Sequence, residues 1–486
     1  MLIGLFTVRI ILKTLGEQDY GIYAVVGGLL AFLTFISGAL STGSQRFFSH
    51  YLGLQNQSEL NHTFRVTLSL YYIVALSIII LGEIIGVWFI NTHLTIPPER
   101  IFAANVIFQF VIISTAFTLI TNPFMSAIMA HEDMHVIGKM AVLDGALKII
   151  ICILLVFSPW DKLISYAFLL LVAAILVQSI YFTFAKNKYQ ECVIKPKWDK
   201  SKLKEITSFS GWNLFGSLAW VGKIQGTSVL LNIFFGPVIN AAQGIANTVR
   251  NFAGTFSTNF SSALSPQIIK NYAIKDYDNL SQLIHRGSKM TFFLMMVIVV
   301  PLIFAIDFML QMWLGDHNKH METFCQLILM EALIDSISTP LASVNQATGK
   351  IALYQALIGF FGLLNLPIAY LFIKLNYPPE WVFIVAVSLQ VFIVGVRILF
   401  LHRIYPGAVK QALINIILPC TIVTGLTFVV CYLFNIHLKE FVTDIPAIIA
   451  YILITFVFIW LLGLKKSERR YIRNFVTTKI KSHNNS

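Results

Sequence analysis

The chain has 486 residues, of which 57% are hydrophobic and only 12% are charged, and its mean hydropathy is +0.76. A soluble domain carries about twice that share of charged residues, so this composition excludes a soluble protein. Apolar runs recur from one end of the chain to the other, and a bilayer core of about 30 Å needs roughly 20 apolar residues per helix. The sequence therefore predicts an all-α integral membrane protein that crosses the bilayer many times.

The apolar runs predict about 14 transmembrane helices. The first run is short because only Met1 to Leu15 precede the turn at Gly16. It has neither a basic n-region nor a small-residue cleavage site, so a signal peptide is a poor interpretation. We expect that the chain begins inside its first helix and that the N-terminal part of this helix is missing. The predicted spans are 1–15, 21–44, 66–90, 102–130, 138–158, 163–185, 208–235, 238–263, 289–312, 322–346, 352–374, 381–404, 411–435 and 443–464.

The positions of Lys and Arg predict the orientation. The chain holds 35 of these residues, and most of those outside the spans lie in the even-numbered connections and in the C-terminal tail. The richest connection is a Lys-rich linker, 186–207. The positive-inside rule places these segments, and with them the C-terminus, in the cytoplasm. The net charge of +12 is then mostly a consequence of topology, which leaves nucleic-acid binding almost without support.

An internal repeat divides the chain. The segment 123–130 is similar to 340–347, and 39–41 is identical to 263–265. Both matches pair a span with the sixth span after it, so the two halves share one orientation. We therefore expect two six-helix lobes that rock about a central cavity. The predicted domains are an N-terminal lobe (1–185), the Lys-rich cytoplasmic linker (186–207), a C-terminal lobe (208–404), and two extra helices with a basic cytoplasmic tail (405–486).

The predicted span 238–263 carries one polar stripe along its length, because its polar residues recur at steps of three and four. Such a stripe cannot face lipid. It faces either a hydrated cavity or polar groups of neighbouring helices. Arg250 favours the cavity, since a full charge near mid-membrane is costly. The other candidate binding residues of the stripe are Asn240, Gln243, Asn247, Asn251 and Thr258.

A second cation lies at similar depth on the preceding span. Lys223 follows Asn213 on the predicted span 208–235. Guanidinium and ammonium groups both bind phosphate strongly, so Lys223 and Arg250 indicate an anionic ligand. Arg9 on the first span is a further candidate. Arg46, at the end of the second span, has the blander explanation that its side chain reaches the membrane interface.

Glu331 and Asp335 form a like-charged pair, four residues apart and near mid-membrane. Both cannot stay ionised there without a partner. Three alternatives stay open: one carboxyl is protonated, the pair binds a coupling cation such as H⁺ or Na⁺, or it neutralises Arg250 or Lys223. The five cysteines are scattered, and no Cys/His cluster occurs, so neither a metal site nor a disulfide framework is indicated. No cofactor is expected.

Four short segments resemble a known family. These are Leu15–Tyr23, Gly211–Gly216, Phe235–Ala242 and Pro266–Ala273. Together they are similar to Wzx-type polysaccharide (O-antigen or capsule) flippases of the MOP superfamily, which are related to MATE and MurJ transporters.

The resemblance implies translocation of an undecaprenyl-diphosphate-linked oligosaccharide from the cytoplasmic to the periplasmic leaflet of the bacterial inner membrane. It further implies that Arg250, Lys223 and Arg9 bind the diphosphate while the polar stripe binds sugars. Membrane lipids and other glycan-assembly membrane proteins are the expected partners.

Two other functions are alternatives to a flippase. A cation-coupled, MATE-like multidrug exporter fits the same architecture, but organic cations favour an acidic cavity. A membrane-bound glycosyl ligase or polymerase needs a long outer loop, and every predicted outer connection is short. Because no nucleophile–base or metal arrangement is present, we expect a transporter with no catalytic residues rather than an enzyme.

Overall fold

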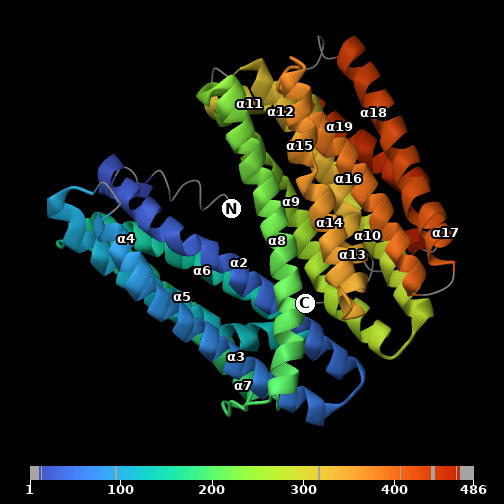
Figure 1. Ribbon diagram of the computed structural model, residues 1–486. Helices are drawn as coiled ribbons and strands as arrows, with labels where there is room; N and C mark the ends of the chain where they lie inside the picture. The colour runs from blue at the N-terminus through green and yellow to red at the C-terminus, as the bar shows by residue number, and fades with distance from the viewer. Residues whose placement is uncertain are drawn as a thin grey trace, which may run out of the picture. The chain divides into compact units, whose positions relative to one another are not determined.

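The computed structural model describes residues 10–11, 14–92, 96–315, 318–404, 407–438, 444–466 and 468–470 (Figure 1). Every regular element in these ranges is helical, which confirms the predicted all-α class. The predicted first span, with the candidate residue Arg9, lies largely outside them.

The chain divides into two compact units. The first unit comprises residues 1–218, 269–275 and 346–355, and the second comprises the remainder. The helices before the Lys-rich linker are α2 (Glu17–Gly53), α3 (Gln57–Leu81), η1 (Gly82–Gly86), α4 (Val87–Thr92), η2 (Pro98–Arg100), α5 (Ile101–Ala130), α6 (Met134–Val156) and α7 (Lys162–Lys188).

The helices after the linker complete the fold. Residues 200–218 of α8 belong to the first unit and the rest of that helix to the second. The bounds are α8 (Lys200–Phe235), α9 (Pro237–Ala273), α10 (Tyr277–Phe304), α11 (Ile306–Leu314), α12 (Lys319–Ser336), α13 (Ser338–Ala347), α14 (Ala352–Leu363), α15 (Asn365–Lys374), α16 (Trp381–Phe400), η3 (Leu401–Arg403), α17 (Ala408–Ala412), η4 (Leu413–Ile417), α18 (Leu418–Leu438), α19 (Asp444–Phe458) and η5 (Ile459–Gly463).

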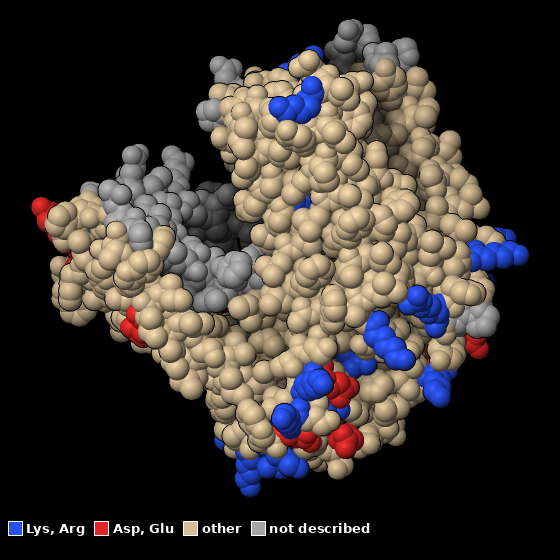
Figure 2. Space-filling model, in the orientation of Figure 1, with Lys and Arg blue, Asp and Glu red and all other residues tan. Residues whose placement is uncertain are grey.

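In the described part of the chain, nine helical segments are long and apolar enough to cross a bilayer. A tenth crossing is formed if α12 and α13, which meet at a bend of 41°, make one broken span. The helix α9 is not among them, because its polar stripe lowers its hydropathy. On the face drawn in Figure 2, charged side chains are few and most of the surface is uncharged, as expected for helices that contact lipid.

A proline explains the bend between α12 and α13. Pro340 lies in the first turn of α13, and its ring nitrogen has no hydrogen to donate to the carbonyl of Ser336, the last residue of α12. The predicted single span 322–346 is therefore two helices. The predicted span 289–312 is likewise divided into α10 and α11, which are separated at Ala305.

The helices α8 and α9 are longer than the spans predicted for them. They contain 36 and 37 residues, or about 55 Å at 1.5 Å per residue, which exceeds a bilayer core of about 30 Å. The end of the predicted linker is thus helical from Lys200 onward. Gly236, in the left-handed region with φ 81°, separates the two helices, and Pro237 begins α9, a position that proline favours.

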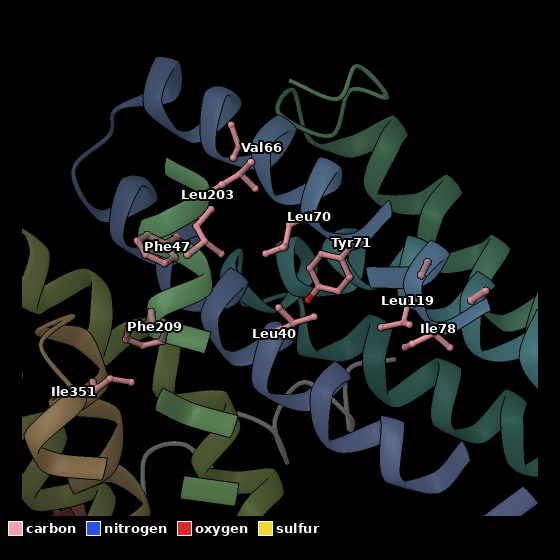
Figure 3. Packing of buried hydrophobic residues seen from close by; sticks show 13 residues of the cluster. Leu40, Phe47, Val66, Leu70, Tyr71, Ile78, Leu119, Leu203, Phe209 and Ile351 are labelled. Atoms are coloured by element: carbon pink, nitrogen blue, oxygen red, sulfur yellow. The ribbon is translucent and has the colours of Figure 1, made fainter. Parts of the chain in front are cut away.

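The core of the first unit is built around a buried tyrosine (Figure 3). Tyr71 of α3 is fully buried among Leu40, Leu70, Ile78 and Leu119. Its hydroxyl lies 3.3 Å from Ser44 Oγ, so its polar atom is satisfied within the apolar cluster. In the second unit, Ala242 and Ala246, one turn apart on α9, are fully buried in the cluster that contains Phe324 of α12. Small residues of this kind allow membrane helices to approach closely.

Candidate functional site

Three charged side chains from three helices meet in the second unit. Lys223 of α8 lies with its Nζ 2.5 Å from Glu331 Oε1 of α12. The Nη2 atom of Arg250 on α9 lies 3.9 Å from the same oxygen. The structure thus brings together two of the three predicted cations, Lys223 and Arg250, and one of the two predicted acids.

The cluster is almost completely enclosed by protein. The side chains of Lys223, Arg250 and Glu331 are 8%, 13% and 6% exposed. Charges in such surroundings are costly unless they are paired and hydrogen-bonded. The pairing of Glu331 corresponds to one of the three alternatives that the sequence left open for this acid.

The aromatic ring of Trp220 lies beside both cations. The Cζ atom of Arg250 is 4.4 Å from the ring centroid and Lys223 Nζ is 5.2 Å from it. Both distances are within the range of cation–π attraction. Sequence analysis missed Trp220, although its position three residues before Lys223 places the two side chains on one face of α8.

The charges of the cluster do not balance. Two cations face one carboxylate, and the close pair is Lys223 with Glu331. The guanidinium of Arg250 makes no hydrogen bond to any other described side chain or carbonyl, although it carries five N–H donors. The arrangement is therefore a buried site with one cation in excess, whose guanidinium keeps its hydrogen-bonding capacity.

The second acid, Asp335, has a different partner. Its Oδ1 accepts a hydrogen bond of 2.7 Å from Gln390 Nε2 of α16, and no Lys, Arg or His of the described chain lies within ion-pair distance of it. Glu331 and Asp335 thus differ in kind, although their spacing on the helix made them equivalent candidates.

The predicted polar stripe of α9 is divided among several surroundings. Asn240 Oδ1 accepts a hydrogen bond of 2.6 Å from Ser228 Oγ, and Gln243 donates to the carbonyl of Ile224 at 3.4 Å. These two contacts join α9 to α8 and match the blander explanation, in which polar groups pair between helices. The remaining candidates are Asn247, which is half-buried, and Asn251 and Thr258, which are exposed.

Asn213 does not lie in the charged cluster. It belongs to the first unit, where it accepts a hydrogen bond of 2.9 Å from Gln355 and donates to the carbonyl of Phe209. Asn213 and Lys223 are only ten residues apart in the sequence, but they belong to different units. Among His, Cys, Asp and Glu of the described residues, no group of three or more is arranged to hold a metal ion.

The charged cluster lies within the part of the chain that matches a known family model. Residues 219–371 match the family model MatE, and this range includes Trp220, Lys223, Arg250 and Glu331. It covers less than half of the chain. No curated protein matches the sequence.

Solved structures match nearly the whole fold. An outward-facing multidrug resistance MATE family transporter of the MOP superfamily is 14% identical, with a TM-score of 0.72, over 84% of this chain and 94% of that chain. The MATE transporter ClbM in complex with Rb⁺ is 17% identical, with a TM-score of 0.67, over 85% and 94%.

A third structure is a MOP superfamily transporter from Pyrococcus furiosus, described by a reverse polarity of its binding pocket that suggests a different function. It is 14% identical, with a TM-score of 0.69, over 84% of this chain and 94% of that chain. At such identities the likeness establishes the fold alone. The chain has the fold of multi-pass MATE transporters.

Proposed function

We propose that this protein is a flippase of the bacterial inner membrane. It moves undecaprenyl-diphosphate-linked oligosaccharides from the cytoplasmic to the periplasmic leaflet by alternating access, for the synthesis of cell-surface polysaccharide. The observation that carries this proposal is the charge balance of the buried cluster, in which Lys223 and Arg250 face the single carboxylate of Glu331. A net cationic site suits an anionic substrate.

Each part of the substrate has a suitable counterpart. The diphosphate would bind Arg250 and Lys223, because guanidinium and ammonium groups form charge-assisted hydrogen bonds with phosphate oxygens. Exposed polar residues of α9, such as Asn251 and Thr258, would bind sugars. The polyprenyl chain would remain in the lipid, since its burial there needs no protein contact.

A multidrug exporter is the second candidate, and its support is the fold shared with a multidrug resistance transporter together with the MatE match. Organic cations would have to bind beside two buried cations, which opposes them electrostatically. The Pyrococcus furiosus transporter, with its binding pocket of reverse polarity, illustrates that pocket polarity differs among proteins of one fold.

One pair of assays separates the two candidates. Cells that lack their own flippase receive this chain or its Arg250→Gln variant, and lipid-linked glycan on the cytoplasmic side is measured. The flippase proposal predicts clearance by the wild type and accumulation with Arg250→Gln, whereas Lys197→Gln, which removes a cation from the α7–α8 connection, should clear the glycan normally. Resistance to cationic drugs without glycan clearance would favour the exporter.

A further inference from the structure

We propose that Glu331 is a built-in competitor of the substrate: it occupies Lys223 while the site is empty and is displaced when a phosphate oxygen of the ligand arrives. This inference rests on the proposed function, because it concerns the same site. In this proposal Glu331 couples transport to neither a proton nor a metal cation. Its carboxylate is the internal anion that the phosphate of the ligand replaces.

The geometry of the carboxylate is the first support. Both cations have their contact with the same oxygen of Glu331, Oε1, at 2.5 Å from Lys223 and 3.9 Å from Arg250. The second distance is too long for a hydrogen bond. A diphosphate has several oxygens on two phosphorus atoms, so it can give Lys223 and Arg250 separate partners at hydrogen-bonding distance. The exchange thus increases the number of charge-assisted hydrogen bonds.

The burial of the cluster gives a reason for an internal anion. Without Glu331, two cations beside the same indole would lie in an enclosed site with no counter-charge, which is strongly unfavourable. A carrier must pass through a state without substrate after it releases its load. Glu331 neutralises Lys223 in that state, and it lowers the affinity for the ligand because the ligand must replace it.

Trp220 contacts both cations independently of Glu331. Its ring contacts Arg250 and Lys223 at 4.4 and 5.2 Å, and these contacts do not require the carboxylate. The cations can therefore keep their positions while the anion between them changes. Asp335 is not the competitor, since it is engaged by Gln390.

The test uses the full chain in neutral-lipid nanodiscs and inorganic pyrophosphate as the probe. Thermal unfolding is followed as the pyrophosphate concentration is raised, which gives the Tm and the half-saturating concentration. Glu331→Gln should lower the Tm in the absence of the anion, and pyrophosphate should restore it. The half-saturating concentration should fall by about tenfold or more, because one charge-assisted hydrogen bond no longer competes.

Matched variants distinguish exchange from a general effect of charge. Asp335→Asn removes the same charge one turn further along α12 and should leave the half-saturating concentration within about twofold of wild type, since Asp335 has no cationic partner. Glu331→Asp retains the charge but withdraws it by one carbon–carbon bond, so its half-saturating concentration should be intermediate. This variant decides the question by the same criterion if Glu331→Gln does not fold.

Two results would overturn the proposal: an unchanged half-saturating concentration, or a lowered Tm that pyrophosphate does not restore. The failure of the flippase proposal is a separate result. Normal glycan clearance by Arg250→Gln together with tighter pyrophosphate binding by Glu331→Gln would remove the flippase and keep the exchange. Loss of glycan clearance in Arg250→Gln, together with unchanged pyrophosphate binding by Glu331→Gln, would keep the flippase proposal and overturn the exchange.

Discussion

Lys289 Nζ of α10 lies 2.6 Å from Glu468 Oε2, which belongs to the segment that follows η5 in the second unit. The two side chains are 2% and 7% exposed. Glu468 Oε2 also accepts a hydrogen bond of 2.8 Å from the backbone N–H of Lys465. A helix assigned by sequence to the C-terminal lobe is thus joined to the segment 405–486, which sequence analysis treated as an addition.

The ion pair predicts that this C-terminal segment is required for folding. Its deletion removes the carboxylate that neutralises Lys289 together with α18 and α19, which pack against α10. Loss of the partner from a buried ion pair costs about 3–5 kcal/mol by itself. The repeat leaves 405–486 outside the two predicted six-helix lobes and therefore gave no reason to expect this requirement. The measurement is the Tm and the folded yield of Glu468→Gln, Lys289→Met and the double variant Lys289→Met, Glu468→Met. We expect both single variants to be less stable than the double variant, and the opposite order would refute the interpretation.

A glycine of the first unit should resist substitution. Gly349 has φ 74°, and a Cβ added to it would lie 2.4 Å from Arg46 Nη2. Arg46 is only 8% exposed and donates to the carbonyl of Ala347 at 3.3 Å, so its guanidinium is held among groups of the protein.

We therefore expect Gly349→Ala to cost at least about 1–2 kcal/mol from the left-handed backbone alone. Gly362→Ala is the matched control, because it lies within α14 with no atom in the way and should stabilise the helix by about 0.5–1 kcal/mol. Equal melting temperatures of the two variants would show that the turn at Gly349 is tolerant.

A buried carboxylate outside the membrane spans predicts sensitivity to acid. Glu191 is 3% exposed, and its Oε1 lies 2.6 Å from His131 Nε2. Burial alone raises the pKa of Glu191, but hydrogen bonds from His131, the backbone and Gln57, with the charge of His131, outweigh burial and hold the pKa below its ordinary value of 4.5. A depressed pKa contributes stability above the ordinary value, which is lost as the pH falls through the lowered one.

The wild-type Tm should therefore fall more steeply below pH 4.5 than that of Glu191→Gln, which lacks this titration. Glu99→Gln, a change at an exposed position, should follow the wild-type curve. Parallel curves for wild type and Glu191→Gln would contradict the prediction.

Topology provides an independent test, because all five native cysteines are buried and give little background labelling. In intact cells, Lys197→Cys should react only with thiol reagents that cross the membrane, since the positive-inside rule places this connection in the cytoplasm. Glu99→Cys, in a connection on the opposite side, should react with impermeant reagents. The reverse pattern would invert the proposed orientation.

Hydropathy predicted most of the fold, because the length of each apolar run is set by the bilayer and not by tertiary contacts. It did not predict the full lengths of α8 and α9, since their ends beyond the bilayer are polar. The sequence shows Pro340 close to the break between α12 and α13. It did not predict the break, because prolines also occur in membrane helices that are not broken. Repeats predicted equivalent halves, and they contain no information on contacts such as that of Lys289 with Glu468.

The charged cluster was predictable as a set of candidates but not as a geometry. The cost of charge in a membrane singled out Lys223, Arg250, Glu331 and Asp335. Which acid neutralises which cation depends on the rotation of α8, α9 and α12 about their axes, which side-chain packing decides. The same packing assigns Asn213 to the first unit, and it brings Trp220 to the cations.

The charge balance of the cluster leads to a prediction that separates substrate binding from mere neutralisation. Arg250→Gln removes the cation of the cluster that is not hydrogen-bonded to Glu331. The diphosphate must then bind through Lys223 alone, after it displaces Glu331, so glycan clearance should fail. Arg250→Lys should retain part of the activity, because an ammonium binds phosphate as a point charge but loses the bidentate geometry. Lys223→Gln should be less severe than Arg250→Gln if Arg250 remains free to bind the ligand.

The decisive variant removes all three charges at once. If Arg250 and Lys223 serve only to neutralise Glu331, then Lys223→Gln, Arg250→Gln, Glu331→Gln should function normally, since no charge is left unpaired. If the cations bind the diphosphate, this triple variant should fold, reach the membrane at wild-type levels and still fail to clear lipid-linked glycan. The double variant Arg250→Gln, Glu331→Gln retains Lys223 without its competitor and should recover part of the activity. Full clearance by the triple variant would end the assignment of a diphosphate site to Arg250 and Lys223.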